Sequence, residues 1–154
     1  MKTGFRIMKN LLLKLIAVGK VKDPHYQAKT AEFLTRIGAY GKLEVVELRD
    51  DTVEKESQAI LKQLERERGM IVVLDEHGRA LTSEALSQVL AECDRRMVFV
   101  VGGAYGFTDA VRERADLVLS LSPMTFTHEM ARLVLAEQLY RAATILAGKK
   151  YHHE

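Results

Sequence analysis

The regular alternation of apolar runs with amphipathic segments is the feature that most limits how this chain can fold. Five short apolar runs are each followed by a segment whose apolar residues recur at helical spacing. A run that is apolar throughout, such as MIVVLD at 70–75, is typical of a strand covered on both faces. Alternating strands and helices favour a mainly parallel sheet with right-handed crossovers. We therefore predict one α/β domain over residues 1–154, with helices on both faces of the sheet and residues 1–10 as a loose extension.

Local signals set the predicted boundaries. Asp23 followed by Pro24 is typical of a helix start, and Asp51 with Glu54 resembles a capping box. Gly148 is a natural end for the last helix. The predicted strands cover 11–19, 42–49, 70–75, 97–102 and 117–122, and the predicted helices cover 24–40, 51–68, 83–96, a short stretch after 108, and 128–147.

The last predicted helix is apolar around most of its circumference. Thirteen of its positions between 130 and 147 are apolar, more than one face of a sheet can cover. Two explanations stay open. Either the helix is sunk in the core, or its second face packs on another copy of the chain, which predicts a homodimer.

Charge and composition narrow the class of protein. The net charge is only +2, but residues 1–42 hold nine Lys or Arg against two acidic residues, so +7 lies there and −5 in the remainder. Such clustering marks either a face for nucleic acid or a plain basic surface. The single cysteine, Cys93, is expected within a helix as inert packing, and with isolated histidines it leads us to predict no metal site.

Membrane and export signals are weak. Lys14 interrupts the apolar run near the N-terminus, and no run approaches the roughly 18 apolar residues of a membrane span. We expect a cytoplasmic protein that does not enter a membrane.

Three loops are expected to share one edge of the sheet. In a parallel sheet the carboxyl ends of the strands meet there, and ligands bind at that edge. The expected loops are 75–78, 102–107 and 120–128. The glycines of the second loop match neither a Walker A loop nor a dinucleotide fingerprint. The second and third loops contain no Lys or Arg, and Arg79 alone is near the first, so the pattern favours a neutral, flat ligand such as an adenosine over a polyphosphate.

Four motifs together carry a family resemblance. They are LDEHG at 74–78, VVGGAYGF at 100–107, LSLSPMTFTHEMARLVLAEQLYRA at 119–142 and YHHE at 151–154. The chain thereby resembles the RlmH-type ribosomal RNA methyltransferases of the SPOUT superfamily, from the AVGK of the first strand to the last residue. The resemblance implies S-adenosylmethionine held in a C-terminal trefoil knot, and a homodimer. It also implies methylation of N3 of a pseudouridine in large-subunit ribosomal RNA, within assembled ribosomes.

The resemblance also assigns residues. Those implied at the cofactor are Leu74, Gly102, Gly103, Leu121, Ser122, Pro123, Met124, Thr125, Phe126 and Thr127. Those implied near the target base are His128, Arg132, Arg141, Tyr151, His152, His153 and Glu154. N3 must lose a proton before it attacks the methyl group, so a nearby base helps. His128, Tyr151, His152 and Glu154 are candidates for that base, and the sequence does not choose among them.

Three positions depart from the family pattern. Thr127 stands in place of a usual proline, Glu129 in place of Gln or an apolar residue, and His153 in place of Arg or Lys. The last exchanges a permanent cation for a titratable one. Two alternatives to the enzyme stay open: a non-catalytic ribosome-binding module of the same fold, and a flavodoxin-like domain that binds a phosphorylated nucleotide.

Overall fold

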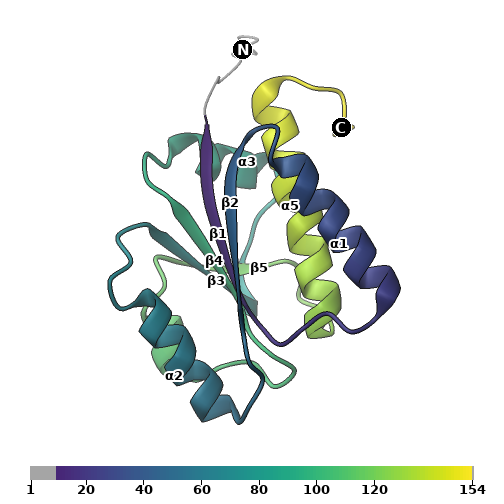
Figure 1. Cartoon of the computed structure of the whole chain (residues 1–154). Helices are drawn as coiled ribbons and strands as arrows, with labels where there is room; N and C mark the ends of the chain where they lie inside the picture. The colour runs from purple at the N-terminus through teal and green to yellow at the C-terminus, as the bar shows by residue number, and fades with distance from the viewer. Residues whose placement is uncertain (1–9, 154) are drawn as a thin grey trace.

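The computed structural model describes residues 10–153, so most of the expected N-terminal extension, residues 1–9, lies outside the described residues, as does Glu154. The elements follow one another along the chain in strict alternation (Figure 1). The strands are β1 Leu11–Val18, β2 Gly41–Leu48, β3 Met70–Ala80, β4 Met97–Val101 and β5 Leu117–Ser120. The helices are α1 Pro24–Ile37, α2 Val53–Leu64, α3 Ser83–Glu92, α4 Asp109–Glu113 and α5 His128–Ala147.

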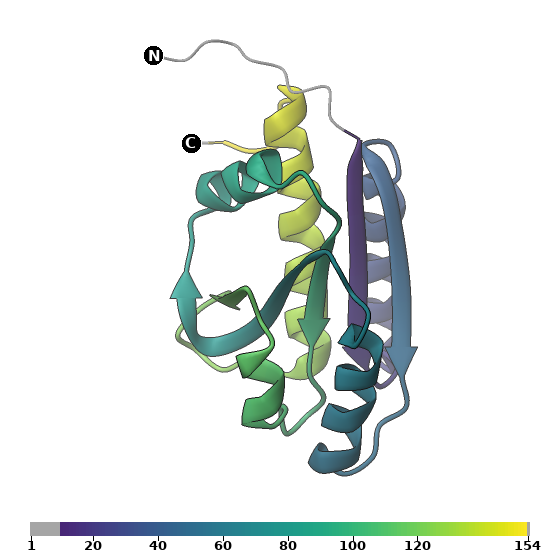
Figure 2. The same cartoon turned by 90° about the vertical axis from the view of Figure 1, so that its left-hand side faces the viewer.

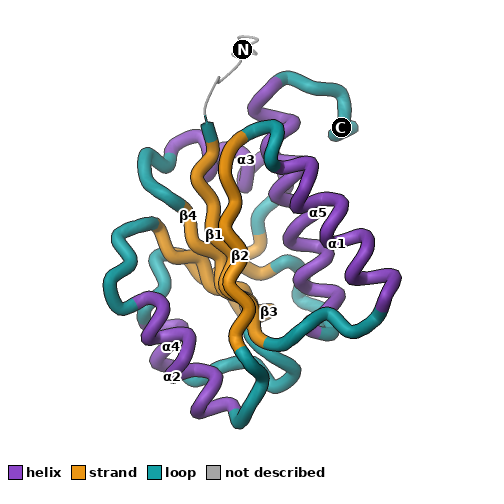
Figure 3. Tube along the Cα trace, viewed as in Figure 1, coloured by secondary structure: helices purple, strands orange, loops and turns teal. Residues whose placement is uncertain are grey.

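The strands form a five-stranded sheet in the order β2-β1-β4-β3-β5, and every neighbouring pair is parallel. One face packs on α1, α3 and α5 through a core that includes Phe99 and Leu139, and the other packs on α2 and α4 around Ile60 and Val111. Figure 3 shows the strands between these two helical layers, and the turned view in Figure 2 places α2 and α4 on the near side. The predicted α/β fold is confirmed.

The strand order excludes one of the alternatives. A flavodoxin-like sheet has the order 2-1-3-4-5. Here β4 lies beside β1, and β3 lies between β4 and β5. The flavodoxin-like prediction is therefore wrong.

Strand β3 is longer than predicted. Residues 75–78 were expected to form a loop, but β3 runs on to Ala80 and pairs with β5 twice, with a register shift between Leu74 and Arg79. Gly78 makes this close pairing possible, because a Cβ there would lie 2.6 Å from the carbonyl oxygen of Val118. The prediction of a loop was wrong because Asp75, Glu76 and Gly78 have low strand propensity, which tertiary pairing overrides.

Several helix ends also differ from prediction. Thr52, not Asp51, caps α2, and Glu56 rather than Glu54 reaches back to accept the Asp51 N–H at 2.8 Å. Helices α2 and α3 each end about four residues before the predicted position, so Cys93 is a buried residue at the end of α3 rather than within it. The start of α1 at Asp23 and the end of α5 at Gly148, with φ of 71°, are as predicted.

Helix α5 packs between α1 and α3 on the sheet, which accounts for much of its apolar circumference. Leu135, Leu139 and Ala142 are fully buried, whereas Leu133 and Ile145 stay half-buried. Burial in the core therefore explains the fully buried apolar residues of α5. For the half-buried ones, contact with a second copy in a homodimer stays a prediction. Among residues 10–153, no helix is both long enough and apolar enough to cross a membrane.

Candidate functional site

A cavity of about 330 Å³ opens at the carboxyl edge of the sheet. Residues 74–76 of β3, the loop after β4 and the loop after β5 line it. The volume is in the range of small-molecule sites. Eight of the ten residues implied at the cofactor line it: Leu74, Gly102, Gly103, Leu121, Ser122, Met124, Thr125 and Phe126. The other two do not. Pro123 is exposed, and Thr127 caps α5 by accepting the Met130 N–H at 3.2 Å, which a proline in that position could not do.

The glycines of the second loop form a tight turn beside this cavity. Gly106, with φ of 79°, donates its N–H to the Gly103 carbonyl at 3.1 Å. A Cβ on Gly102 would lie 2.8 Å from the Phe107 ring, and one on Gly103 would lie 2.9 Å from Glu56 Oε1. A side chain at Gly102 would therefore force the Phe107 ring to move, and one at Gly103 would force the Glu56 carboxylate to move.

The loop after β5 is fixed by hydrogen bonds rather than by packing alone. Ser122 Oγ accepts the Met124 N–H at 3.0 Å, and the Thr125 hydroxyl donates to the Glu76 carboxylate. Ser120 Oγ donates to the Glu76 backbone carbonyl at 3.0 Å. These bonds tie the loop to the irregular part of β3, and the cavity wall is thereby held in place.

The cavity is acidic. Its lining includes Asp75 and Glu76 and contains no Lys or Arg. Burial acts to raise the pKa of Asp75, but the His77 N–H and the Arg112 guanidinium outweigh it, so the pKa of this carboxyl lies below its usual range. Arg112 balances the charge of Asp75, so Glu76 is the carboxylate of the lining that can favour a ligand with a positive centre and disfavour a polyphosphate.

His128 is the first residue of α5, half-buried, and it lines this cavity and a neighbouring one. The next residue, Glu129, accepts the backbone N–H groups of Lys22 and Asp23 at 3.0 and 3.1 Å. These two bonds lower the pKa of Glu129. The departure at Glu129 thus fixes the segment after β1 to the start of α5, next to His128.

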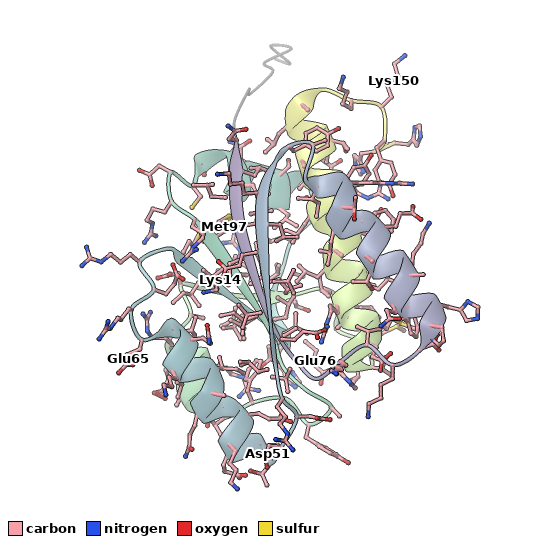
Figure 4. The ribbon with its side chains drawn as sticks, in the orientation of Figure 1. Lys14, Asp51, Glu65, Glu76, Met97 and Lys150 are labelled. Carbon is pink, nitrogen blue, oxygen red and sulfur yellow. The ribbon has the colours of Figure 1, made fainter. Side chains whose placement is uncertain are left out.

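The other residues expected near the base lie at the opposite end of α5. Arg141 is thirteen residues after His128, or about 20 Å along the helix. Figure 4 shows the separation: Glu76, on the cavity, lies near the lower end of α5, and Lys150, at the start of the tail, lies beyond the upper end. Within one chain, the structure does not bring the two halves of the expected site together.

The tail is docked on α5, not frayed. Tyr151 donates its hydroxyl to Glu137 Oε2 at 2.8 Å, and its ring packs against that of Tyr140 with centroids 4.7 Å apart. Arg141 also binds Glu137, at 2.6 Å. Burial and the Glu137 carboxylate raise the pKa of Tyr151, so its phenol stays protonated at neutral pH.

The ring of His152 is also engaged. Arg141 Nη1 lies 3.0 Å from His152 Nδ1, and since a guanidinium can only donate, Nδ1 must accept. Nε2 then donates to Glu84 Oε2 at 3.0 Å. Neither Tyr151 nor His152 offers a free basic atom in this arrangement. His153 is exposed.

Arg132, which was expected near the target nucleobase, is engaged within the protein instead. It is buried, pairs with Glu47 at 2.6 Å and donates to the Gly19 carbonyl at 2.7 Å. It therefore holds the end of β1 against α5. Within residues 10–153, no three His, Cys, Asp or Glu side chains gather as metal ligands would.

Sequence reasoning missed two residues at this edge. Tyr105 is 88% exposed and lines both cavities, and its place between glycines in an apolar loop could have marked it. Glu56 is buried against Gly103, 47 positions away in the chain, and no local pattern indicates that contact.

Comparison with known proteins agrees with this geometry. The family model described as "Predicted SPOUT methyltransferase" matches residues 11–152. Two curated proteins named "Ribosomal RNA large subunit methyltransferase H" align over 92% of this chain and 98% of their own length: that of Gloeobacter violaceus is 44% identical and that of Geobacter metallireducens 41%. A solved structure, that of a probable methylase family protein from Haemophilus influenzae, superposes with a TM-score of 0.59 at 11% identity, over 96% of this chain and 72% of that one. The chain belongs to the SPOUT methyltransferase family.

Proposed function

We propose that this protein methylates N3 of a pseudouridine in large-subunit ribosomal RNA, using S-adenosylmethionine, in the assembled ribosome. Family membership and the names of the relatives support the reaction and the RNA class. The observation that carries the proposal is the cavity that the irregular part of β3 and the loops after β4 and β5 form at the carboxyl edge of the sheet, with carboxylates but no Lys or Arg in its lining.

The lining of this cavity fits the cofactor. Leu74, Leu121 and Phe126 offer apolar surface for an adenosine, and the backbone at Gly102 and Gly103 offers polar groups without side chains in the way. The Glu76 carboxylate suits a positive sulfonium or ammonium. Bound there, S-adenosylmethionine supplies an already activated methyl group. The protein aligns the acceptor nitrogen and excludes water.

His128 is the candidate for the base that takes the N3 proton. It alone among the described candidates lies at the cavity, and the first turn of α5 fixes its position. Tyr151 and His152 have their polar atoms engaged about 20 Å away along α5.

The separation of the two ends of α5 supports a homodimer. If the tail acts on the target base, it must come from a second copy whose α5 runs in the opposite direction. The half-buried apolar residues Leu133 and Ile145 give such a contact a surface. The Tyr151 tail of one subunit then lies over the cavity of the other, as expected of an isologous pair.

The family also implies a C-terminal trefoil knot and a cytoplasmic enzyme of one domain. The double pairing of β3 with β5, and the return of the chain along α5 between α1 and α3, are compatible with the knot. A ribosomal substrate fits the cytoplasm.

The test is direct. The protein is incubated with methyl-labelled S-adenosylmethionine and ribosomes that lack the modification, and the label is mapped in the RNA. We expect label at N3 of one pseudouridine. Cofactor binding without any label would favour the non-catalytic ribosome-binding module.

A further inference from the structure

A second cavity, of about 270 Å³, lies beside the first. The two share Gly103, Ala104, Tyr105 and His128, so one strip of chain separates them. The rest of the second wall comes from the end of β1 and the segment after it, the segment after β2, α2 and the start of α5. Its charged side chains are Lys20, Lys22, Asp50, Asp51, Glu56 and Glu129. A molecule bound in the second cavity would therefore be separated from a ligand in the first cavity only by the Gly103 backbone and the His128 side chain.

Glu56 is the most fixed polar side chain in this wall. It is 5% exposed, and its Oε2 accepts the Asp51 N–H at 2.8 Å. Its Oε1 lies 2.9 Å from the point that a Cβ on Gly103 would occupy, so the carboxylate rests against the strip between the cavities. Glu56 lines only the second cavity, which places an oriented acceptor on the side turned away from the cofactor.

We propose that the second cavity receives the acceptor base, and that Glu56 accepts a hydrogen bond from the ring N1–H that distinguishes pseudouridine from uridine. The inference rests on the proposed function and assigns its substrate selectivity to one carboxylate.

The ring chemistry supports this orientation. Pseudouridine carries two ring N–H groups, at N1 and N3, on either side of the C2 carbonyl. With N3 turned to the cofactor cavity past His128, N1 points into the second cavity, where Glu56 offers an acceptor. Uridine presents a C–H at the same place because its sugar is attached through N1. The Glu56 carboxyl oxygen can therefore accept a hydrogen bond from pseudouridine and not from uridine.

Two further features of the cavity suit a nucleobase. Lys20 and Lys22 can donate to ring carbonyls, and the exposed Tyr105 ring stands where a base can stack. The lining has more carboxylates than lysines, which makes the cavity unfavourable for a phosphate; the carboxylates are those of Asp50, Asp51, Glu56 and Glu129.

The first test is Glu56→Gln, assayed on ribosomes with pseudouridine and on ribosomes with uridine at the target. The Asp51 N–H retains the amide oxygen, so the amide NH₂ takes the place of Oε1 and opposes the N1–H donor. We expect kcat/KM on pseudouridine to fall by at least about tenfold, with activity on uridine and S-adenosylmethionine affinity unchanged. Glu54→Gln, the same change at an exposed site two residues earlier in α2, should keep the wild-type ratio. A variant Glu56→Gln with the wild-type ratio would overturn the proposal.

The second test changes the substrate and leaves the protein intact, so it stands even if the Glu56 variant does not fold. Wild-type protein is given reconstituted ribosomes that carry uridine, pseudouridine or 1-methylpseudouridine at the target. We expect pseudouridine to react at least about tenfold faster than both others, because each lacks the N1–H. Equal rates for pseudouridine and 1-methylpseudouridine would refute the role of Glu56. No methylation of any substrate would instead refute the proposed function.

Discussion

The two ends of helix α5 are built from different chemistry. At its first turn, the cavity is lined by backbone, small side chains and two carboxylates, with His128 as the one ring that can take a proton. At its far end, Arg141, Tyr151 and His152 form a network of charged and aromatic groups around Glu137. The first end suits a small cofactor with a positive centre, and the second suits RNA. Helix α5 keeps the two ends about 20 Å apart, so if both act on one base, as proposed, the far end must come from a second copy.

The largest expected effect comes from removing the far end. A chain that stops at Gly148 loses the Tyr151 and His152 contacts but keeps the cavity intact. We expect methyl transfer to ribosomes to fall by about 10²–10⁴-fold, the size of a lost acid–base or positioning group. Calorimetric binding of S-adenosylmethionine should be nearly unchanged. Wild-type methylation rates from the truncated protein would show that the tail has no part in the reaction.

A change at the cavity end of α5 should instead weaken cofactor binding. Gly103→Val places a branched side chain against Glu56 and Val18 and into the cavity wall. Overpacking of this kind costs about 1–3 kcal/mol unless the backbone moves, and movement of residues 103–105 would reshape the cofactor cavity that they line, so we expect S-adenosylmethionine binding to weaken by about tenfold or more. Gly103→Ala, with only a Cβ, should have a smaller effect. Equal affinity in all three proteins would contradict the assignment of this cavity to the cofactor.

Mixing these two impaired proteins, at an S-adenosylmethionine concentration too low to fill the Gly103→Val cavity, tests whether the ends come from different subunits. In a mixed dimer, the truncated chain offers an intact cavity, and the Gly103→Val chain offers an intact tail. If subunits exchange at random, about a quarter of the composite sites should be complete, so activity should return to roughly that fraction. No recovery, with exchange verified by mass spectrometry, would place both ends of the site in one chain.

Substitutions along α5 separate folding from association. Leu139 is fully buried, so Leu139→Glu should unfold the chain, whereas Ile145 is half-buried and Ile145→Glu should leave a folded monomer. Sedimentation and circular dichroism distinguish these outcomes. A wild-type protein that is monomeric at micromolar concentration would contradict the homodimer.

Local sequence signals predicted most of the fold, because its strands and helices agree with their own periodicity. The start of α1 at Asp23 and both ends of α5 could be predicted because the residues that set each helix end lie next to it in the sequence. The failures are non-local. Residues 75–78 have turn composition, yet β3 continues through them because the residues on either side pair with β5. The close approach of Gly78 to Val118 cannot be read from the sequence.

The candidate site also has parts that local sequence signals predict and parts that depend on contacts between distant residues. Loops that leave one edge of a parallel sheet must meet, so the cavity could be predicted from strand positions. The resemblance gave Arg141 and the tail as partners of that cavity, but it carried no information on which chain provides them. Glu56 was missed because its contact with Gly103 depends on how α2 packs on the sheet.

The smallest expected effect concerns acid at the cavity end. Hydrogen bonding to His77 and pairing with Arg112 outweigh burial and hold the pKa of Asp75 below its ordinary value of about 3.9. A carboxyl with a depressed folded-state pKa adds stability above its unfolded-state pKa, and that stability disappears as pH falls through the folded-state pKa. The melting temperature of Asp75→Asn should therefore be about 2–4 °C below that of the wild type at pH 7. Between pH 5 and pH 3 it should fall less than the melting temperature of the wild type. Asp109 also bonds Arg112, at 3.0 Å, but its side chain is 91% exposed, so Asp109→Asn should keep the wild-type acid response. The same acid response in all three proteins would show that the Asp75 pair does not stabilise this end of the molecule.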